Sequence, residues 1–187
     1  LEEYFCRYHI SQISSEKTVS VIKRCKAEGK IFSAGVSINN LSLNENDIGD
    51  FKTFLKISPP LRTERDRVAL IEGINDGSID VIVSDHKPED VESKRLTFSQ
   101  AATGATGIET LLPLALELFH NKLVKFEKLI ALMTSSPAKI LDIDKGSLDI
   151  GKDADLCVLD INKPWVVKQN ELKSKSKNTP IENRMLQ

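Results

Sequence analysis

The chain has 187 residues, of which 40% are hydrophobic and 28% are charged, so its composition is that of a globular protein with one domain or slightly more. Lysine and arginine together number 26 and aspartate and glutamate 27, which gives a net charge of −1. This balance argues against nucleic acid as the main partner, because phosphate binding needs a basic face.

No stretch of the sequence has the composition of a membrane span or a secretion signal. The longest apolar stretch, residues 108–119, is interrupted by Glu109 and Glu117 and is well short of the ~20 residues that cross a bilayer. Residues 1–5 contain neither a basic nor an apolar region. We therefore expect no membrane association and no secretion.

The three cysteines indicate a reducing compartment. Cys6, Cys25 and Cys157 are an odd number at wide spacing, with no CxxC pair and none of the close spacings that hold zinc. They are interpreted as reduced thiols of a cytoplasmic protein.

The first elements predict a parallel α/β architecture. Residues 7–13 alternate and favour a strand, residues 16–29 have apolar positions near helical spacing, and residues 30–38 form a second strand. Ser14 or Ser15 is the expected N-cap of the helix. A strand, a helix and a strand with short connections are typical of a parallel sheet.

The pattern continues after the polar stretch of residues 39–50. Residues 54–57 predict a short strand, and residues 62–74 a helix with Thr63 as its N-cap. Residues 79–84 are a run of β-branched residues, which is typical of a strand covered on both faces.

A loop rich in Lys, Glu, Thr and Gly is predicted at residues 85–107. Three helices are expected next, over residues 109–120, 125–134 and 138–141. The tail then changes character, with short strands predicted at residues 156–160 and 165–167 and a solvated surface loop at residues 168–177.

The first candidate site lies where the strand at residues 79–84 ends. Ligands of parallel α/β folds bind at the carboxyl ends of strands, and Asp85 and His86 leave this strand at that end. An aspartate there can ligate a metal ion or take a proton from a metal-bound water. The alternative is that Asp85 caps the following turn and that His86 is a surface residue.

The second candidate site is the stretch AATGATGIE at residues 101–109. Gly104 and Gly107 would let the backbone approach a ligand, and the following helix N-terminus offers N–H groups to an anion. A tight connection between loop and helix is an equally good interpretation. His9 and His120 are more typical of packed or surface histidines, and the three histidines have no ligand spacing.

Segments along essentially the whole chain resemble bacterial dihydroorotases of the amidohydrolase superfamily, and allantoinases and hydantoinases share several of them. The segments are residues 8–14 (YHISQIS), 56–62 (KISPPLR), 80–88 (DVIVSDHKP), 107–113 (GIETLLP), 136–141 (SPAKIL), 151–156 (GKDADL) and 177–180 (KNTP).

The resemblance implies a (β/α)8 barrel with a small β domain built from both chain ends. Residues 1–142 would be the second half of this TIM-type barrel, and residues 143–187 the small β segment and the tail. The family hydrolyses the cyclic amide of dihydroorotate at a zinc site, where an aspartate after the last strand shuttles the proton. Asp85 matches that aspartate, so the resemblance makes it the candidate catalytic residue and a candidate metal ligand.

Two other metal-ligand positions differ from the family's pattern. Gln12 stands where the family's YHVCHVS strand has a ligating histidine, and Asn39 and Asn40 replace the histidine pair of its PHH motif. Amide oxygens are weaker zinc ligands than imidazole. The family's zinc is therefore expected to be absent or weakly bound here.

The substrate side also differs. Glu89 replaces the last histidine of the family's DHAPH motif, and Ser58 replaces an asparagine before the paired prolines. A carboxylate at position 89 should repel the dihydroorotate anion. The resemblance nevertheless places His86, Ala102, Gly104, Glu89 and Ser58 in the substrate-binding region.

The family's first metal-binding motif would precede Leu1, so the resemblance implies a fragment or a clipped chain with about four of the eight barrel strands. We expect it to associate with its missing N-terminal half or with further copies of itself. Two hypotheses remain for function. One is an inactive dihydroorotase-like partner, for example of aspartate transcarbamoylase. The other is an active zinc enzyme with a rearranged metal site or a shifted cyclic amide substrate.

Overall fold

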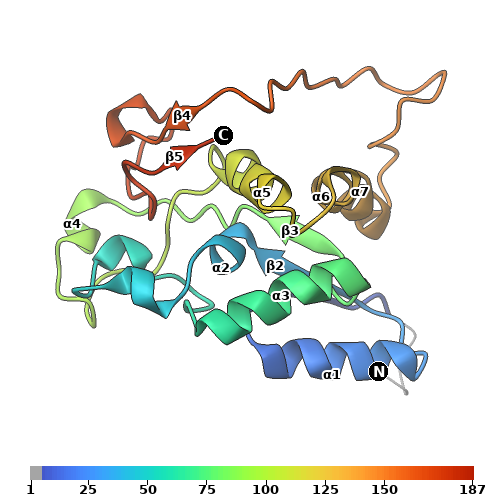
Figure 1. The fold of residues 1–187 in the computed structure, drawn as a ribbon, viewed down its shortest axis with the longest axis horizontal. Helices are drawn as coiled ribbons and strands as arrows, with labels where there is room; N and C mark the ends of the chain where they lie inside the picture. The colour runs from blue at the N-terminus through green and yellow to red at the C-terminus, as the bar shows by residue number, and fades with distance from the viewer. Residues whose placement is uncertain (1–5) are drawn as a thin grey trace.

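Three parallel strands form the central sheet of the protein. The computed structural model describes residues 6–187, so the prediction made for residues 1–5 lies outside the described residues. The strands are β1 (His9–Ile13), β2 (Ser33–Ser37) and β3 (Val81–Val83), and they lie in the order β1-β2-β3 (Figure 1). All pairings within this sheet are parallel, which confirms the α/β class.

Two capped helices connect the strands. Helix α1 (Glu16–Ala27) begins after Ser15, whose hydroxyl accepts a hydrogen bond from the Thr18 N–H. Helix α3 (Glu64–Asp76) begins after Thr63, whose hydroxyl accepts from the Asp66 N–H. Both predicted helices are confirmed, and α3 is displaced by two residues toward the C-terminus. The two helices pack against each other beneath the sheet in Figure 1.

The segment between β2 and α3 contains three short helices instead of the strand predicted at residues 54–57. They are α2 (Ile38–Ser42), η1 (Glu45–Ile48) and η2 (Thr53–Leu55). The strand prediction was wrong because Leu55 and Ile57 are buried by packing, and so short an apolar run has no periodicity that separates strand from helix.

Four α-helices follow β3. They are α4 (Val91–Lys94), α5 (Leu111–His120), α6 (Phe126–Met133) and α7 (Ser135–Leu141). The helices predicted at residues 109–120, 125–134 and 138–141 are confirmed, whereas α4 lies in a segment that we expected to be a loop. Among the described residues, no helix is long and apolar enough to cross a membrane.

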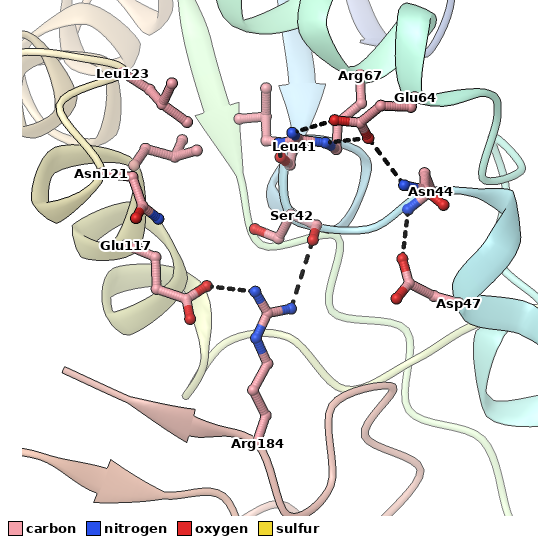
Figure 2. A pocket seen from close by; sticks show the side chains of 11 residues that line it. Leu41, Ser42, Asn44, Asp47, Glu64, Arg67, Glu117, Asn121, Leu123 and Arg184 are labelled. Atoms are coloured by element: carbon pink, nitrogen blue, oxygen red, sulfur yellow. Dashed lines mark hydrogen bonds and ion pairs between the residues drawn. The ribbon is translucent and has the colours of Figure 1, made fainter.

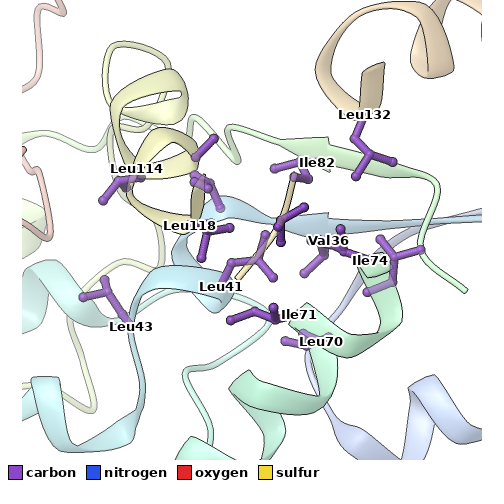
Figure 3. Close-up of a cluster of buried hydrophobic side chains, with 14 of the residues drawn as sticks. Val36, Leu41, Leu43, Leu70, Ile71, Ile74, Ile82, Leu114, Leu118 and Leu132 are labelled. Carbon is purple, nitrogen blue, oxygen red and sulfur yellow. The ribbon is translucent and has the colours of Figure 1, made fainter. Parts of the chain in front are cut away.

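The core joins the sheet to the helices that follow it. Figure 3 shows Val36 of β2 and Ile82 of β3 among apolar side chains of α3, α5 and α6. Those side chains are Leu70, Ile71 and Ile74 of α3, Leu114 and Leu118 of α5, and Leu132 of α6. This packing holds the three strand ends in place, and the candidate site is built on those ends.

The tail has little regular structure. Residues 142–164, which we call the arm, run extended from α7 to β4 (Trp165–Val166), and β4 pairs antiparallel with β5 (Met185–Leu186) (Figure 1). The strand predicted at residues 156–160 was wrong, because no described segment pairs with it and Val158 is fully exposed.

Only part of the segment between the two tail strands is the solvated loop expected at residues 168–177. A short helix, η3 (Gln169–Glu171), begins the segment, and Leu172 after it is buried. The backbone N–H groups of Lys173 and Ser174 donate to the Glu109 carboxylate. The loop is therefore attached, just before helix α5, to the body of the molecule, by which we mean residues 6–141.

Candidate active site

The predicted metal-ligand positions lie at one edge of the sheet. Gln12 is near the end of β1, Asn39 and Asn40 follow β2, and Asp85 follows β3. Because the three strands are parallel neighbours, their carboxyl ends meet at the same edge. The structure thus brings together residues that are 73 positions apart in the chain.

Asp85 is buried and hydrogen-bonded. Its side chain is 2% exposed, and its Oδ1 accepts a 2.7 Å hydrogen bond from Gln12 Nε2 and lies 3.0 Å from Lys87 Nζ. Its backbone has a φ of 49°, in the left-handed region that non-glycine residues rarely adopt. The strand end therefore holds this carboxylate in a strained conformation with two donors directed at one oxygen.

The two asparagines after β2 are poorly satisfied. Asn39 is completely buried, and neither polar atom of its side-chain amide has a hydrogen-bond partner within residues 6–187. Asn40 donates a 3.1 Å bond to the Pro60 carbonyl oxygen, while its own Oδ1 is buried and has no partner in the described part of the chain. A buried unpaired polar group costs about 1–3 kcal/mol, so this part of the site is not optimised for stability.

The described side chains do not fit a zinc ion. Within residues 6–187, no three His, Cys, Asp or Glu side chains are grouped so as to hold a metal ion. Gln12 directs its N–H toward Asp85, and an N–H group cannot coordinate a cation. Asp85 Oδ1 is not free to bind a metal ion, because Gln12 Nε2 and Lys87 Nζ already contact it.

The His86 side chain is hydrogen-bonded to the loop that precedes helix α5. Its Nδ1 accepts hydrogen bonds from the Gly107 N–H at 3.2 Å and from the Ile108 N–H at 3.4 Å. This acceptor role places the proton of the neutral ring on Nε2. The interpretation of His86 as a surface residue was wrong, since the half-buried ring fixes the glycine loop before α5.

The two glycines serve close backbone packing. A Cβ at Gly104 would lie 2.6 Å from the Lys87 carbonyl oxygen, and a Cβ at Gly107 would overlap the Ser84 carbonyl oxygen. Gly104 also has a φ of 155°. The geometry favours the tight connection over the anion site, because the loop packs on the segment after β3 and His86 occupies two of its N–H groups.

Asn178 connects the tail to the candidate site. Its Nδ2 donates to the Gly104 carbonyl at 3.1 Å, its Oδ1 accepts from the Glu89 N–H at 3.2 Å, and its backbone carbonyl accepts from the Thr106 N–H. In the sequence, Asn178 stood out only as part of the KNTP motif. It contacts Gly104 and Glu89, which are 74 and 89 positions away in the chain, so no local sequence pattern indicates these contacts.

Lys94 was also missed. Its side chain is buried, and its Nζ donates to the carbonyl oxygens of Ala102 at 2.7 Å and Thr53 at 3.1 Å. Burial lowers the pKa of this ammonium group. The capping pair of Asp90 and Ser93, in which the Asp90 carboxylate accepts from the Ser93 N–H, was the available sequence signal for helix α4.

The predicted substrate-binding residues lie in one group of connected loops. Lys87 Nζ donates to the Ser58 carbonyl at 3.2 Å, and the Gly104 N–H donates to the Lys56 carbonyl. With the contacts above, these bonds connect Ser58, His86, Glu89, Ala102 and Gly104. Their role in binding substrate remains a prediction.

A polar cavity of about 680 Å³ lies elsewhere, between α2, α3, α5 and the end of the tail (Figure 2). Its Arg67 pairs with Glu64 at 2.6 Å, and its Arg184 pairs with Glu117 at 2.8 Å. The bond from Arg67 lowers the pKa of Glu64 to about 2, whereas burial raises the pKa of Glu117. Because both arginines already have carboxylate partners, we assign this cavity no ligand.

A parallel sheet with helices after its strands, and with candidate site residues at its carboxyl edge, is the arrangement of part of a TIM-type barrel. The chain belongs to the amidohydrolase family, whose sequence profile matches residues 8–185. This membership confirms the partial barrel fold that the family resemblance implied.

Curated relatives are named dihydroorotase. The chain is 41% identical over 177 residues to the dihydroorotase of Ehrlichia canis (strain Jake), covering 95% of this chain and 40% of that protein. It is 40% identical over 174 residues to the dihydroorotase of Acetivibrio thermocellus, covering 92% of this chain and 41% of the relative. The chain thus spans about two fifths of the length of these relatives.

Solved structures of hydantoinases have the same fold. The L-hydantoinase (dihydropyrimidinase) from Arthrobacter aurescens superimposes with a TM-score of 0.93 at 30% identity, over 99% of this chain and 42% of that one. The D-hydantoinase from Thermus sp. superimposes with a TM-score of 0.87 at 21% identity, over 100% of this chain and 43% of that one, and shows the fold alone.

Proposed function

We propose that this chain acts in a dihydroorotase-family protein of pyrimidine biosynthesis and that its site does not hydrolyse a cyclic amide. The observation that carries this proposal is the engagement of Asp85 Oδ1 by Gln12 and Lys87. A general base must reach the proton that it abstracts, and the Asp85 oxygen that would accept this proton already has two donors directed at it. In this proposal zinc is absent or weakly bound.

The proposed role is that of a non-catalytic partner, for example of aspartate transcarbamoylase, in the cytoplasm. The arm supports association, because Leu148, Ile150, Leu156 and Val158 are exposed along one extended segment. Several exposed apolar side chains within one short segment favour an interaction site. We propose that the arm contacts the partner, and that the chain also associates with polypeptide equivalent to the rest of the relatives' length or with a second copy of itself.

The alternative is an active zinc-dependent dihydroorotase, or a related cyclic amidohydrolase, with a rearranged metal site. The position of Asp85 at the carboxyl edge supports it, together with the attachment of His86 to the glycine loop. In this alternative the substrate is dihydroorotate or another cyclic amide, and Asp85 shuttles the proton.

Hydrolysis of dihydroorotate tests these two proposals. The complete natural polypeptide that contains this sequence would be assayed at high concentration with and without added zinc, beside the Ehrlichia canis dihydroorotase as a comparator. We expect no zinc-dependent turnover from folded protein. Turnover above a metal-free control would contradict the inactive role and favour the alternative.

If no turnover is found, size-exclusion chromatography with aspartate transcarbamoylase tests the partner role. Co-elution is expected, and it should weaken when Leu148 and Ile150 are changed to serine. Separate elution of the two folded proteins would reject aspartate transcarbamoylase as the partner.

A further inference from the structure

The side chain of Asp85 is almost completely removed from solvent, although it ends in a carboxyl group. It is 2% exposed, whereas Lys87 is 46% exposed. A carboxylate in such a position is tolerated only when it is paired or bound to a metal, because desolvation of an isolated ion is very costly. Whatever partners Asp85 has in this structure are therefore essential to the strand end.

Both donors contact the same oxygen atom. Gln12 extends from β1 to Asp85 after β3, past the end of the central strand β2. Lys87 lies two residues after Asp85, and its ammonium group turns inward to Asp85 Oδ1 and to the Ser58 carbonyl oxygen. One donor supplies a full positive charge and the other a neutral hydrogen bond.

The resemblance described in the sequence analysis implies that both donors depart from the family's pattern. It aligns Gln12 with a histidine of the YHVCHVS strand and Lys87 with the alanine of the DHAPH motif. Substitutions that are 75 positions apart in the sequence thus contact one carboxylate oxygen. A loss of metal ligands without replacement would leave this oxygen uncompensated, whereas here it is fully paired.

We propose that Lys87, assisted by Gln12, supplies the counter-charge that a metal ion would supply to Asp85, so that this strand end is a metal-independent ion pair. The ammonium group excludes a divalent cation from Asp85, because two positive charges would compete for one oxygen at short range. The inference deepens the proposed non-catalytic function, since a carboxylate paired in this way stabilises the sheet edge. Lys87 is here a positioning residue.

This proposal predicts that restoring histidines alone does not restore a zinc site. A change of Gln12→His leaves the Lys87 ammonium group 3.0 Å from Asp85 Oδ1. Removal of the lysine has to accompany the histidine. Lys87 is thus the residue that decides whether Asp85 is available to a metal ion.

A stability cycle is the first test, in the complete natural polypeptide at pH 7. Lys87→Met should lower the thermal unfolding midpoint by about 3–6 °C, because Asp85 loses its counter-charge. Lys87→Arg should retain most of the midpoint. Asp85→Asn in the Lys87→Met background should restore at least half of the loss, because the uncompensated charge is removed.

The matched control is Lys145→Met, which removes a lysine that pairs with exposed Asp153 and Asp155. It should shift the midpoint little, because exposed ion pairs contribute little. The proposal fails if Lys87→Met shifts the midpoint no more than Lys145→Met, or if Asp85→Asn restores nothing.

Zinc binding is the second test, with zinc alone as the probe in equilibrium dialysis. In the natural background, Asp85→Asn should leave the zinc content unchanged. The double variant Gln12→His with Lys87→Ala should gain about tenfold in zinc affinity, and added Asp85→Asn should remove the gain. A loss of zinc on Asp85→Asn in the natural background, or no gain in the double variant, would overturn the proposal.

Neither test measures hydrolysis, so the two proposals can fail separately. Zinc-dependent turnover together with the predicted cycle at Lys87 and Asp85 would remove the non-catalytic function and keep the ion pair. Absence of turnover together with failure of the cycle would support the non-catalytic function and reject the proposed ion pair.

Discussion

The body of the molecule and its arm differ in how their apolar residues are used. In the body, Ile74 of α3 and Leu114 of α5 are completely buried. In the arm, Ile150 and Val158 are fully exposed, and Lys145 makes ion pairs with two exposed carboxylates of the same segment. The body therefore has its own core, whereas the arm has apolar residues that no described part of the chain covers.

This difference shows that apolar content by itself does not make a core. The side chains of the body are brought together by β2, β3 and three helices, as Figure 3 shows. The arm, in contrast, is a single extended segment, and no strand among the described residues pairs with it. Burial of apolar area stabilises only where several elements meet.

The largest effect is expected from shortening a core side chain. Ile74→Ala should destabilise the chain by about 3–4 kcal/mol, because it removes buried methylene groups and leaves a cavity. The matched change Ile150→Ala in the arm should alter stability by less than about 0.5 kcal/mol. Urea unfolding of both variants measures the difference. A large loss from Ile150→Ala would show that the arm is covered in solution, and the comparison would no longer hold.

An intermediate effect is expected where the tail is attached to the body. Asn178→Ala should cost about 2 kcal/mol, because the Glu89 N–H and the Gly104 carbonyl lose their partner in a buried position. Amide hydrogen exchange should become faster at Glu89. Asn162→Ala, an exposed asparagine in the arm, is the control. Unchanged protection at Glu89 would show that the tail does not hold the site loops.

The smallest effect is expected at the ion pair of Glu64 and Arg67. The pKa of Glu64 is lowered from 4.5 to about 2, so its stabilisation is complete above about pH 4.5 and is lost as the pH falls toward 2. The side chain is half exposed, so the loss should be less than about 1 kcal/mol. Glu64→Gln should reduce the pH dependence of the free energy of unfolding between pH 4.5 and 2, and exposed Glu45→Gln should not. An equal pH dependence in the two variants would show that the ion pair does not stabilise the fold.

The elements that were predicted correctly have local signals. Helices α1 and α3 were found because Ser15 and Thr63 cap them and apolar residues recur at helical spacing. The segments predicted as strands at residues 54–57 and 156–160 have a local composition similar to that of the true strands. Neither of them has a strand partner among the described residues. A strand depends on its neighbour for hydrogen bonds, and the neighbour is not visible in the local sequence.

The candidate site was predictable in its positions and not in its contacts. Gln12 and Asp85 could be placed at strand ends from the pattern of apolar residues, and the family resemblance gave each a role. That Gln12 donates to Asp85, and that Lys87 turns inward, depends on side-chain directions at a sheet edge built from distant segments. Asn178 and Lys94 were missed for the same reason.

The sequence by itself determined the parallel α/β class, the capped helices and the strand end that carries Asp85, because caps and periodicity act over a few residues. Only the tertiary structure decided which donors neutralise Asp85, that the glycines serve backbone packing, and that the arm remains uncovered. These features depend on burial and on contacts such as that of Gln12 with Asp85, which are 73 positions apart, and such contacts exist only after the chain has folded.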